Sequence, residues 1–291
     1  MSSTHSKIIL ITGTSSGFGL LIAARLASLG HIVYATMRNL EKQSALLSEV
    51  NRRGGEVLVR QLDVTDKESI QRTIEEIANR HGYLDILVNN AGYVMGGAFE
   101  DLSDEDIRDQ MEVNFFGVQN LTRAVIPLMR SRRQGKIINI SSVAGLDASP
   151  GLGAYNASKW ALEGFSESLE SELAQWGIQV LLIEPGTYDT KIFRDNTRLA
   201  HNFNNPESPY YAMSQHIHKR LMDYVNHCHR DPENIAILVE KLIQQKNPSF
   251  RNMPDLECRV RVLLRKFLPF NIYRRIIRNV IFKGFDESAT K

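Results

Sequence analysis

Tyr155 and Lys159 stand four residues apart in a segment with helical periodicity. Side chains with this spacing project from one face of a helix, so the phenol and the ammonium are expected to lie close together. A free tyrosine has a pKa of about 10, and a neighbouring ammonium stabilises the phenolate and lowers that pKa. The pair is therefore a candidate general acid and base at neutral pH.

Ser142 is a further candidate catalytic residue. It follows the apolar run at residues 136–140, where its hydroxyl could bind the same substrate oxygen as Tyr155. A serine at the end of a strand can also cap a helix or turn, and most isolated Tyr-x-x-x-Lys pairs are solvated helix faces. Position favours catalysis, because the pair follows a predicted strand whose carboxyl end opens beside the nucleotide site described next.

A glycine-rich loop follows the first apolar run of the chain. Its sequence is Thr12-Gly13-Thr14-Ser15-Ser16-Gly17-Phe18-Gly19, and a predicted helix comes directly after it. Glycine allows a tight turn and close approach of backbone N–H groups to a pyrophosphate, and the helix amino terminus favours the anion. This context favours a dinucleotide site over an ordinary strand-to-helix turn.

Arg38 bears on the choice of dinucleotide. Many NAD sites place an Asp or Glu about 20 residues beyond the glycines, where it binds the ribose 2′-hydroxyl. Residues 20–40 contain no acidic side chain but include Arg38, just after the second predicted strand. A guanidinium there would bind a 2′-phosphate, whereas a carboxylate would repel it. We therefore predict NADP(H) over NAD(H); the alternative is that Arg38 is a solvated loop charge.

Short apolar runs alternate with helical periodicity over most of the chain. We expect strands at residues 7–11, 32–35, 56–62, 84–88, 136–140 and 178–183. Helices are expected at residues 17–29, from residue 66, at 103–129 and at 154–176. The alternation predicts parallel strands with helices on both faces, so the expected fold class is α/β with a Rossmann-type doubly wound parallel sheet.

The residues singled out so far resemble the short-chain dehydrogenase/reductase family. The resemblance covers residues 7–246 and is carried by the glycine loop, Asp63-Val64, Asn89-Asn90-Ala91-Gly92, Asn114, Ser142, Tyr155, Lys159 and Pro185-Gly186. These motifs occur in the family's order and at its spacings, which makes the resemblance specific. All four catalytic positions of the family are filled, which argues against a catalytically inactive relative.

The resemblance implies a role for each catalytic position. Tyr155 would transfer the proton to or from the alcohol oxygen, and Ser142 would hydrogen-bond and polarise that oxygen. Lys159 would hold the nicotinamide ribose and lower the pKa of Tyr155. Asn114 would hold a water that extends the proton relay to solvent.

The resemblance also implies the cofactor site. Asp63 and Val64 would contact adenine, Pro185-Gly186 with Thr190 would hold the carboxamide end, and Arg38 matches the position typical of NADP enzymes. The residues expected to contact the cofactor are Gly13, Ser15, Ser16, Gly17, Phe18, Gly19, Arg38, Asp63, Val64, Asn90, Ala91, Gly92, Tyr155, Lys159, Pro185, Gly186 and Thr190.

Residues 187–230 form a long insertion between Pro185-Gly186 and a helix start at Asp231-Pro232. A long insertion at this place is commonly a lid, and this one contains the aromatic residues Tyr188, Phe193, Phe203, Tyr210, Tyr211 and Tyr224. The rings favour an apolar substrate, steroid-, retinoid- or lipid-like, unless they only pack the lid onto the body. Within the family, the closest resemblance is to the branch of hydroxysteroid and retinol dehydrogenases.

Metal binding is not expected. His216 and His218, like His227 and His229, are two residues apart and would point in different directions on a helix, and no carboxylate completes a site at a suitable spacing. Solvated lid histidines are the better interpretation. The two cysteines, Cys228 and Cys258, are expected to be reduced thiols.

The net charge of +2, from 35 basic and 33 acidic side chains, conceals a basic C-terminal extension, residues 247–291. Residues 259–283 hold eight Lys or Arg and no Asp or Glu, which leaves 27 basic against 33 acidic side chains elsewhere. Apolar spacing predicts two amphipathic helices separated by Pro269. Their partner could be the acidic body, a second subunit or, as peripheral contact, anionic lipid; nucleic acid is not expected, because no base-reading motif is evident.

With 43% hydrophobic and 23% charged residues, the composition excludes a disordered chain. No apolar run reaches the roughly 18 residues of a membrane span, so we expect a cytoplasmic protein; the resemblance implies a homodimer or homotetramer. The predicted function is an NADP(H)-dependent oxidoreductase that interconverts a carbonyl and an alcohol on an apolar substrate. The alternative is a non-catalytic NADPH-binding scaffold or redox sensor. A sugar epimerase or dehydratase would need a second substrate domain that is not evident.

Overall fold

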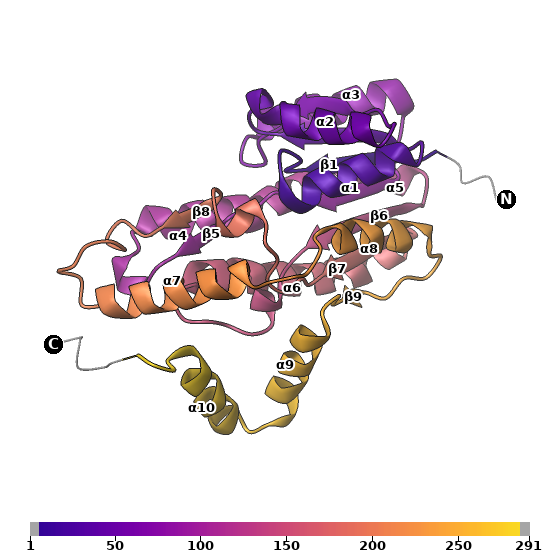
Figure 1. Cartoon of the computed structure of the whole chain (residues 1–291). Helices are drawn as coiled ribbons and strands as arrows, with labels where there is room; N and C mark the ends of the chain where they lie inside the picture. Colours follow the sequence, from indigo (N-terminus) through magenta and orange to yellow (C-terminus); the bar gives the residue numbers. More distant parts are fainter. Residues whose placement is uncertain (1–5, 286–291) are drawn as a thin grey trace.

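The computed structural model describes residues 6–285, which contain a central parallel sheet of seven strands in the order β3-β2-β1-β4-β6-β7-β9 (Figure 1). The strands are β1 (Ile8–Thr12), β2 (Ile32–Met37), β3 (Leu58–Gln61), β4 (Ile86–Asn89), β6 (Gly135–Ile140), β7 (Ile178–Ile183) and β9 (Arg251–Asn252). Every residue of β1 and β4 is buried, as expected for strands covered on both faces. Strand order reverses beside β1, which has β2 on one side and β4 on the other. Their carboxyl ends flank the switch point at which such sheets bind ligands.

Helices cover both faces of this sheet. One face carries α1 (Gly17–Ser28), α2 (Ser44–Arg52) and α8 (Glu233–Gln244); the other carries α3 (Lys67–His81), α5 (Gly117–Ser131) and α6 (Gly153–Ala174). Each layer closes its own apolar core, with Ile22 and Val239 in the first and Ile77 and Leu121 in the second. The predicted α/β fold with a doubly wound parallel sheet is confirmed. Helix α2 was not predicted.

The helix predicted over residues 103–129 is interrupted. It consists of α4 (Asp104–Met111), a π-helical turn η3 (Glu112–Phe116) and then α5. Ser103 and Asp106 form a capping box at the start of α4, with the Ser103 hydroxyl accepting from the Asp106 N–H at 3.0 Å. The apolar spacing in the sequence did not reveal this π turn. Such turns are frequent at functional sites, and this one contains Asn114.

The predicted lid, residues 187–230, is only partly helical. It contains a 3₁₀ turn η5 (Lys191–Phe193), a strand β8 (Thr197–Leu199) and helix α7 (Tyr211–Asn226). Strand β8 pairs with β5 (Val94–Gly96), which follows β4 in the chain and leads to the 3₁₀ turn η2 (Phe99–Asp101). Strands of three residues are too short to show a period, which explains why neither was predicted. Their pairing ties the lid to the body.

The C-terminal extension does not begin where it was predicted. Strand β9, which belongs to the main sheet through pairing with Leu182 and Ile183, lies beyond residue 246. The flanking prolines Pro248 and Pro254 gave this two-residue strand the pattern of a loop. After it come α9 (Leu256–Phe267) and α10 (Phe270–Ile281), with Pro269 between them. Figure 1 shows these two helices as a V that projects from the body on the side of α7. Among the described residues, no helix is long and apolar enough to cross a membrane.

Candidate active site

The glycine loop connects β1 to α1, and there is no space for a side chain at Gly13 or Gly19. Gly13 has a φ of +70°, and a Cβ on it would lie 2.8 Å from the Ala91 Cα. A Cβ on Gly19 would lie 2.4 Å from the Gly13 carbonyl oxygen. The Asn90 amide fixes the loop by donating to the carbonyl oxygens of Thr12 and Gly13, at 2.9 and 3.1 Å. Helix α1 has no acidic residue in its first turn and no side-chain cap, which suits a pyrophosphate at its N-terminus.

A cleft of about 340 Å³ extends from this loop across the switch point. Its lining includes the predicted cofactor residues Gly13, Ser15, Ser16, Gly17, Phe18, Arg38, Asp63, Val64, Asn90, Ala91, Gly92 and Thr190. Gly19 is absent from this lining because it packs against Gly13 beneath the loop. Lys42 also lines the cleft with Arg38; it belongs to η1 (Leu40–Gln43), a turn capped by the Asn39 side chain. Sequence reasoning missed Lys42, although its distance of four residues from Arg38 was a usable signal.

A smaller cavity of about 60 Å³ continues from the cleft to the candidate catalytic residues. Asn114, Ser142, Tyr155, Lys159, Pro185 and Gly186 line it, and it shares Asn90, Gly92 and Thr190 with the cleft. The structure therefore brings all four candidate catalytic residues to the inner end of the predicted cofactor site. The glycine cradle and the lining that the cleft shares with the cavity fit a dinucleotide.

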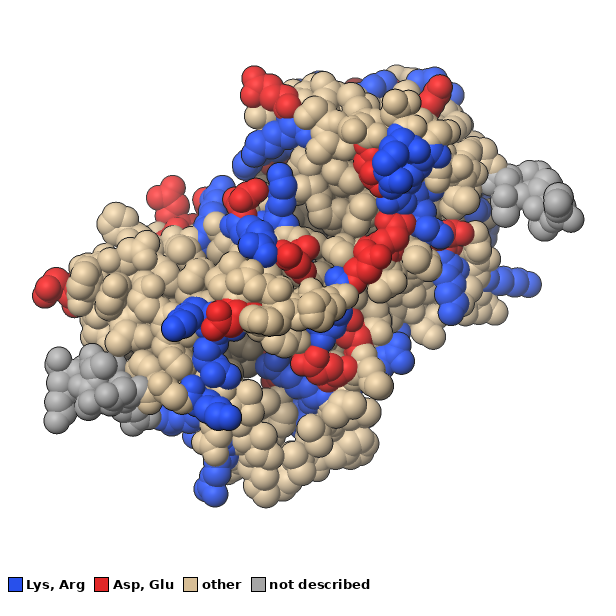
Figure 2. Space-filling view, viewed as in Figure 1, with Lys and Arg blue, Asp and Glu red and all other residues tan. Residues whose placement is uncertain are grey.

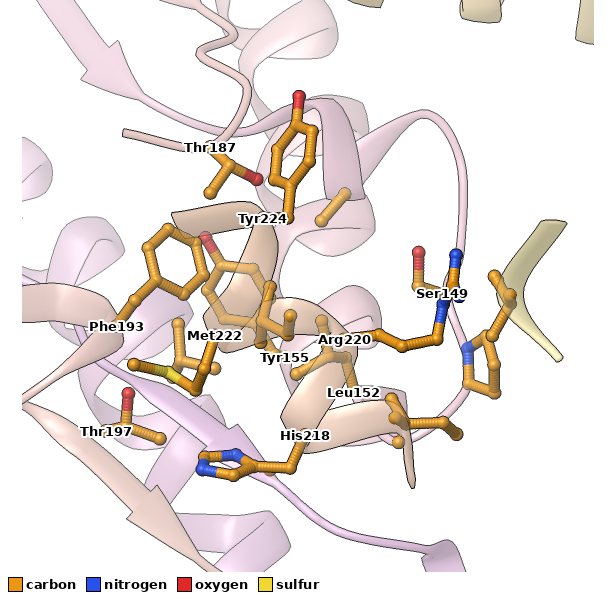
Figure 3. A pocket seen from close by; sticks show the side chains of 18 of the residues that line it. Ser149, Leu152, Tyr155, Thr187, Phe193, Thr197, His218, Arg220, Met222 and Tyr224 are labelled. Atoms are coloured by element: carbon orange, nitrogen blue, oxygen red, sulfur yellow. The ribbon is translucent and has the colours of Figure 1, made fainter. Parts of the chain in front are cut away.

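A third cavity, of about 340 Å³, opens on the far side of Tyr155. Most of its lining is apolar, with Val94, Leu152, Phe193, Phe203, Ile217, Leu221 and Met222 among the side chains and Ser142 and Tyr155 at one end. Figure 3 shows the rings of Phe193 and Tyr155 and the side chain of Met222 in this cavity. Of the six lid aromatics, Phe193, Phe203 and Tyr224 line it, whereas Tyr188 is buried beneath and packs edge-on to Phe18. Three lid rings thus line the cavity, and a fourth packs the lid onto the body.

Burial acts in opposite directions on Tyr155 and Lys159. It raises the pKa of Tyr155 to about 12, and the Ser142 hydroxyl acts in the opposite direction. It lowers the pKa of Lys159 to about 8, which the nearby Glu163 partly offsets. The Lys159 Nζ donates to the Ile140 carbonyl oxygen at 2.9 Å and lies 5.8 Å from the centre of the Tyr155 ring. The lysine is therefore the cation on this chain that is placed to make the phenol a stronger acid.

Ser142 caps a turn, which is one of the two interpretations that the sequence left open, and it also faces the candidate site. It is the N-cap of η4 (Val143–Gly145), where its Oγ accepts from the Ala144 N–H at 3.1 Å. The same hydroxyl donates to the Pro185 carbonyl oxygen at 3.4 Å. It lines the small cavity and the apolar cavity, so a substrate oxygen beside Tyr155 would meet an oriented hydroxyl.

Asn114 is fully occupied by protein partners. Its Oδ1 accepts from the Tyr93 N–H at 3.1 Å, and its Nδ2 donates to the Tyr93 carbonyl at 3.0 Å and to the Ser158 Oγ at 3.3 Å. A water ordered at this residue would therefore bind its backbone, which the π turn holds, and not its side-chain amide.

A buried acidic network behind the site was not predicted. Glu163 lies one helical turn after Lys159 and accepts from the Ser141 hydroxyl, next to Ser142. Arg251 of β9 donates to Glu163 and, at 2.8 Å, to Glu184, the residue before Pro185-Gly186. Burial, with Glu163 adding to it, raises the pKa of Glu184 to about 7. A glutamate at the end of the apolar run 178–183 was the available signal.

The C-terminal extension also supports the site. Asp255, just before α9, accepts from the Gly186 N–H and from the Tyr188 hydroxyl, both at 2.8 Å. A Cβ on Gly186 would lie 2.5 Å from the Cys258 Sγ, so only glycine fits between the strand end and α9. The loop expected to hold the carboxamide end of a cofactor is thus fixed from behind by the start of the extension.

The lid histidines have contacts of their own. A ring nitrogen of His216 lies 3.2 Å from the Ile281 carbonyl oxygen, and one of His227 lies 2.7 Å from the Asp223 carbonyl oxygen of its own helix. Within residues 6–285, no three His, Cys, Asp or Glu side chains are grouped so that they could hold a metal ion. Cys228 and Cys258 are both free thiols.

A dinucleotide cleft that meets a buried tyrosine and lysine and a half-buried serine at the carboxyl edge of a parallel sheet is characteristic of nicotinamide-dependent oxidoreductases. The family model described as short chain dehydrogenase matches residues 7–199. The chain belongs to the short-chain dehydrogenase/reductase family.

Curated relatives cover nearly the whole chain. A 3-ketodihydrosphingosine reductase of Bacteroides thetaiotaomicron is 38% identical over 94% of this chain and 97% of its own length. Retinol dehydrogenase 8 of Bos taurus is 32% identical over 95% of this chain and 91% of its own length. The resemblance to the branch that includes retinol dehydrogenases is therefore supported, together with oxidoreductase activity as the class.

Solved structures agree on the fold and on the type of cofactor. A short-chain dehydrogenase from Streptomyces avermitilis is 33% identical, with a TM-score of 0.78, over 97% of this chain and 99% of its own. One from Burkholderia phymatum, in complex with NAD, is 26% identical with a TM-score of 0.79, over 91% and 95%. A metagenomic oxidoreductase in complex with NADP is 30% identical with a TM-score of 0.67, over 87% and 97%. A nicotinamide dinucleotide is thus supported as the cofactor, while both phosphorylation states occur among the neighbours.

Proposed function

We propose that the protein is an NADP(H)-dependent oxidoreductase that interconverts a carbonyl and an alcohol on an apolar, lipid-like substrate. The observation that carries this proposal is the apolar cavity of about 340 Å³ that begins at Ser142 and Tyr155. The lining is mostly apolar, although it also includes charged side chains such as Asp147, Arg220 and Arg261, and a pocket of this kind orients a substrate by its functional group. The printed names of the curated relatives, a 3-ketodihydrosphingosine reductase and a retinol dehydrogenase, support this substrate class.

The chain's own residues supply the proton chemistry. The bound nicotinamide supplies the hydride for reduction and accepts it in oxidation. Ser142 donates a hydrogen bond to the substrate oxygen, and Tyr155 gives that oxygen its proton or removes it. Lys159 would hold the nicotinamide ribose and favour the phenolate, and Asn114 would order a water on the path from Lys159 to solvent. The buried position of Tyr155 and Lys159 excludes bulk water from the transfer.

The preference for NADP(H) is supported by the charge of the cleft. Arg38 and Lys42 line the same end of it, and no acidic side chain occurs in residues 20–40 to bind a ribose 2′-hydroxyl. Two cations beside the adenosine ribose favour the additional phosphate of NADP. Family membership alone does not decide this preference, because neighbours with NAD and with NADP share the fold.

The experiment is NADPH oxidation with a panel of carbonyl compounds, from short water-soluble ketones to long-chain ketones. We expect turnover that improves with apolar chain length and is lost in the Tyr155→Phe variant, which should still bind NADPH in a fluorescence titration. An active Phe variant contradicts the assignment of Tyr155. NADPH binding without turnover of any carbonyl by the unmodified protein favours the sensor alternative instead.

A further inference from the structure

The two helices of the C-terminal extension expose their apolar sides. The exposed apolar side chains of α9 and α10, here called the tail surface, include Leu263, Phe267, Phe270, Ile272, Ile276 and Val280. Phe267 is 74% exposed and Phe270 is 60% exposed. An amphipathic helix of a globular protein normally turns this stripe towards the core, so the described part of the chain leaves the stripe uncovered.

Ion pairs on the opposite side hold α9 and α10 in this orientation. Asp147, in the loop after η4, is 4% exposed and accepts from Arg261 and Arg265 of α9. The Tyr273 hydroxyl of α10 donates to the same carboxylate at 2.6 Å. Rotating α9 to bury its apolar side would remove both cations from the buried Asp147 carboxylate, which is strongly unfavourable, and rotating α10 would remove the Tyr273 hydroxyl from it. The exposed position of the tail surface is therefore built into the contact with the body.

Positive charge accompanies the tail surface. Residues 259–283 contain eight Lys or Arg and no acidic residue. Arg261 and Arg265 form ion pairs with Asp147, whereas Arg274 and Arg275 on α10 are exposed. Figure 2 shows Lys and Arg side chains beside uncharged surface where α9 and α10 project from the body. Apolar side chains flanked by cations favour a partner that has an apolar interior beneath a negatively charged surface.

We propose that the tail surface docks on an anionic lipid bilayer, with its apolar side chains among the acyl chain ends nearest the headgroups and its cations against lipid phosphates. Amphipathic helices with Lys and Arg beside a strongly apolar side bind membranes in this way. A second copy of the chain is the less suitable occupant. A two-fold contact through the tail surface would bring two positively charged surfaces together, with no acidic residue in 259–283 to neutralise them.

The docked surface leads directly to the substrate cavity. Val280 belongs to the tail surface, and with Ile281 it also lines the apolar cavity that ends at Tyr155. Arg220 and Leu221 of lid helix α7 line the same cavity. Docking would therefore place a wall of the cavity at the bilayer, so that a lipid-like substrate could enter without crossing water. This consequence rests on the function proposed above, whereas bilayer docking itself does not.

The test is cosedimentation of the full-length protein with vesicles. We expect binding to vesicles of phosphatidylcholine with 30% phosphatidylglycerol, about tenfold or more weaker binding to pure phosphatidylcholine, and weakening of the anionic binding at high salt. The double variant Leu263→Gln/Phe267→Gln should lose at least tenfold in affinity for the anionic vesicles. The double variant Arg274→Gln/Arg275→Gln should lose about 30-fold at low salt, from a contribution of about 1 kcal/mol per cation.

Leu47→Gln is the matched control, because Leu47 is an exposed leucine on α2, far from the tail in Figure 1. It should bind anionic vesicles like the unmodified protein. Circular dichroism of each variant separates lost docking from lost folding. Absence of vesicle binding by the folded, unmodified protein overturns the proposal, and so does equal binding by the Leu263→Gln/Phe267→Gln variant. A change from dimer to monomer in that variant, without vesicle binding by the parent, identifies a subunit interface instead.

Enzyme assays keep this proposal separate from the proposed function. Turnover of a water-soluble ketone with NADPH in the absence of vesicles should be the same for the parent and both double variants, since neither pair lines the cofactor cleft or the substrate cavity. Turnover of a long-chain ketone embedded in anionic vesicles should fall with the loss of binding. Vesicle binding without any turnover would contradict the proposed function and leave bilayer docking supported.

Discussion

At the scale of single residues, the site depends on a tyrosine that burial makes a weaker acid and a lysine that burial makes a stronger one. The pKa of Tyr155 is raised to about 12 and that of Lys159 is lowered to about 8. Near neutral pH both groups are protonated in the free protein, which is the state required for giving a proton to a carbonyl oxygen.

This ordering predicts the pH profile of reduction. The phenol keeps its proton up to about pH 12, whereas Lys159 loses its charge above about pH 8. Because kcat/KM for NADPH reports groups of the free enzyme, it should be level from pH 6 to about 7, reach half its maximum near pH 8 and fall further above it. Initial rates with a saturating soluble ketone measure it. A profile that stays level to pH 10 would show that the charge of Lys159 does not control the reaction.

Arg38 makes a prediction about cofactor choice. Replacing Arg38 by Asp removes a charge-assisted contact worth about 1.5–3 kcal/mol and adds repulsion of the 2′-phosphate. The ratio of kcat/KM for NADPH to that for NADH should fall at least tenfold in Arg38→Asp, and less in Lys42→Gln. Arg72→Asp, on α3 and outside the cleft, serves as the charge-matched control. An unchanged ratio in Arg38→Asp would end the case for NADP selection at this residue.

At the scale of elements, regular strands and long helices could be predicted from the sequence, whereas the short strands and the π turn that shape the site could not. The buried run of β1 and the amphipathic spacing of α3 repeat over enough residues to show their period. Strands β5, β8 and β9 are too short to do so, and the π turn around Asn114 is specified by tertiary contacts. The catalytic and cofactor residues were proposed from motifs that each form a local turn or helix face. The link between Glu184 and Arg251 joins residues 67 positions apart and leaves no local pattern.

Glu184, at the sheet edge behind the site, should make the free energy of unfolding depend on pH. Its pKa in the folded protein, about 7, lies above the ordinary value of 4.5 because of burial. The folded state therefore holds more protons than the unfolded state between these values, so the free energy of unfolding falls as pH rises through this window. The shift corresponds to about 3 kcal/mol at most.

The variant Glu184→Gln should remove this contribution. Compared with the parent, its free energy of unfolding should decline less between pH 5 and 8, as measured by urea titration at several pH values. Glu207→Gln, at an exposed position of the lid, is the control and should follow the parent. Parallel pH dependences of Glu184→Gln and the parent would mean that Glu184 is ionised in the folded protein throughout this range.

At the scale of the whole molecule, the small net charge of +2 separates into an acidic body and a basic extension that meet at Asp147. That carboxylate lies between the loop after Ser142 and both tail helices. Asp255 makes the second junction, to Gly186 and Tyr188. The extension is therefore an integral wall of the substrate cavity, although its sequence lies outside the motifs of the family and the matched residues 7–199.

The variant Asp147→Ala tests this view of the molecule. It leaves Arg261, Arg265 and Tyr273 without their shared acceptor, and breaking a buried pair of this kind costs roughly 3 kcal/mol or more. Amide hydrogens of α9 and α10 should then exchange more than about a hundredfold faster, while those of β1 and β4 stay protected. Asp109→Ala, which removes an exposed ion pair with Arg198, should leave exchange in both regions unchanged. With its wall released, the Asp147→Ala cavity should bind long-chain ketones more weakly, which raises KM for them more than for short ketones. Fast exchange that spreads to the central strands would instead show that Asp147 stabilises the whole fold.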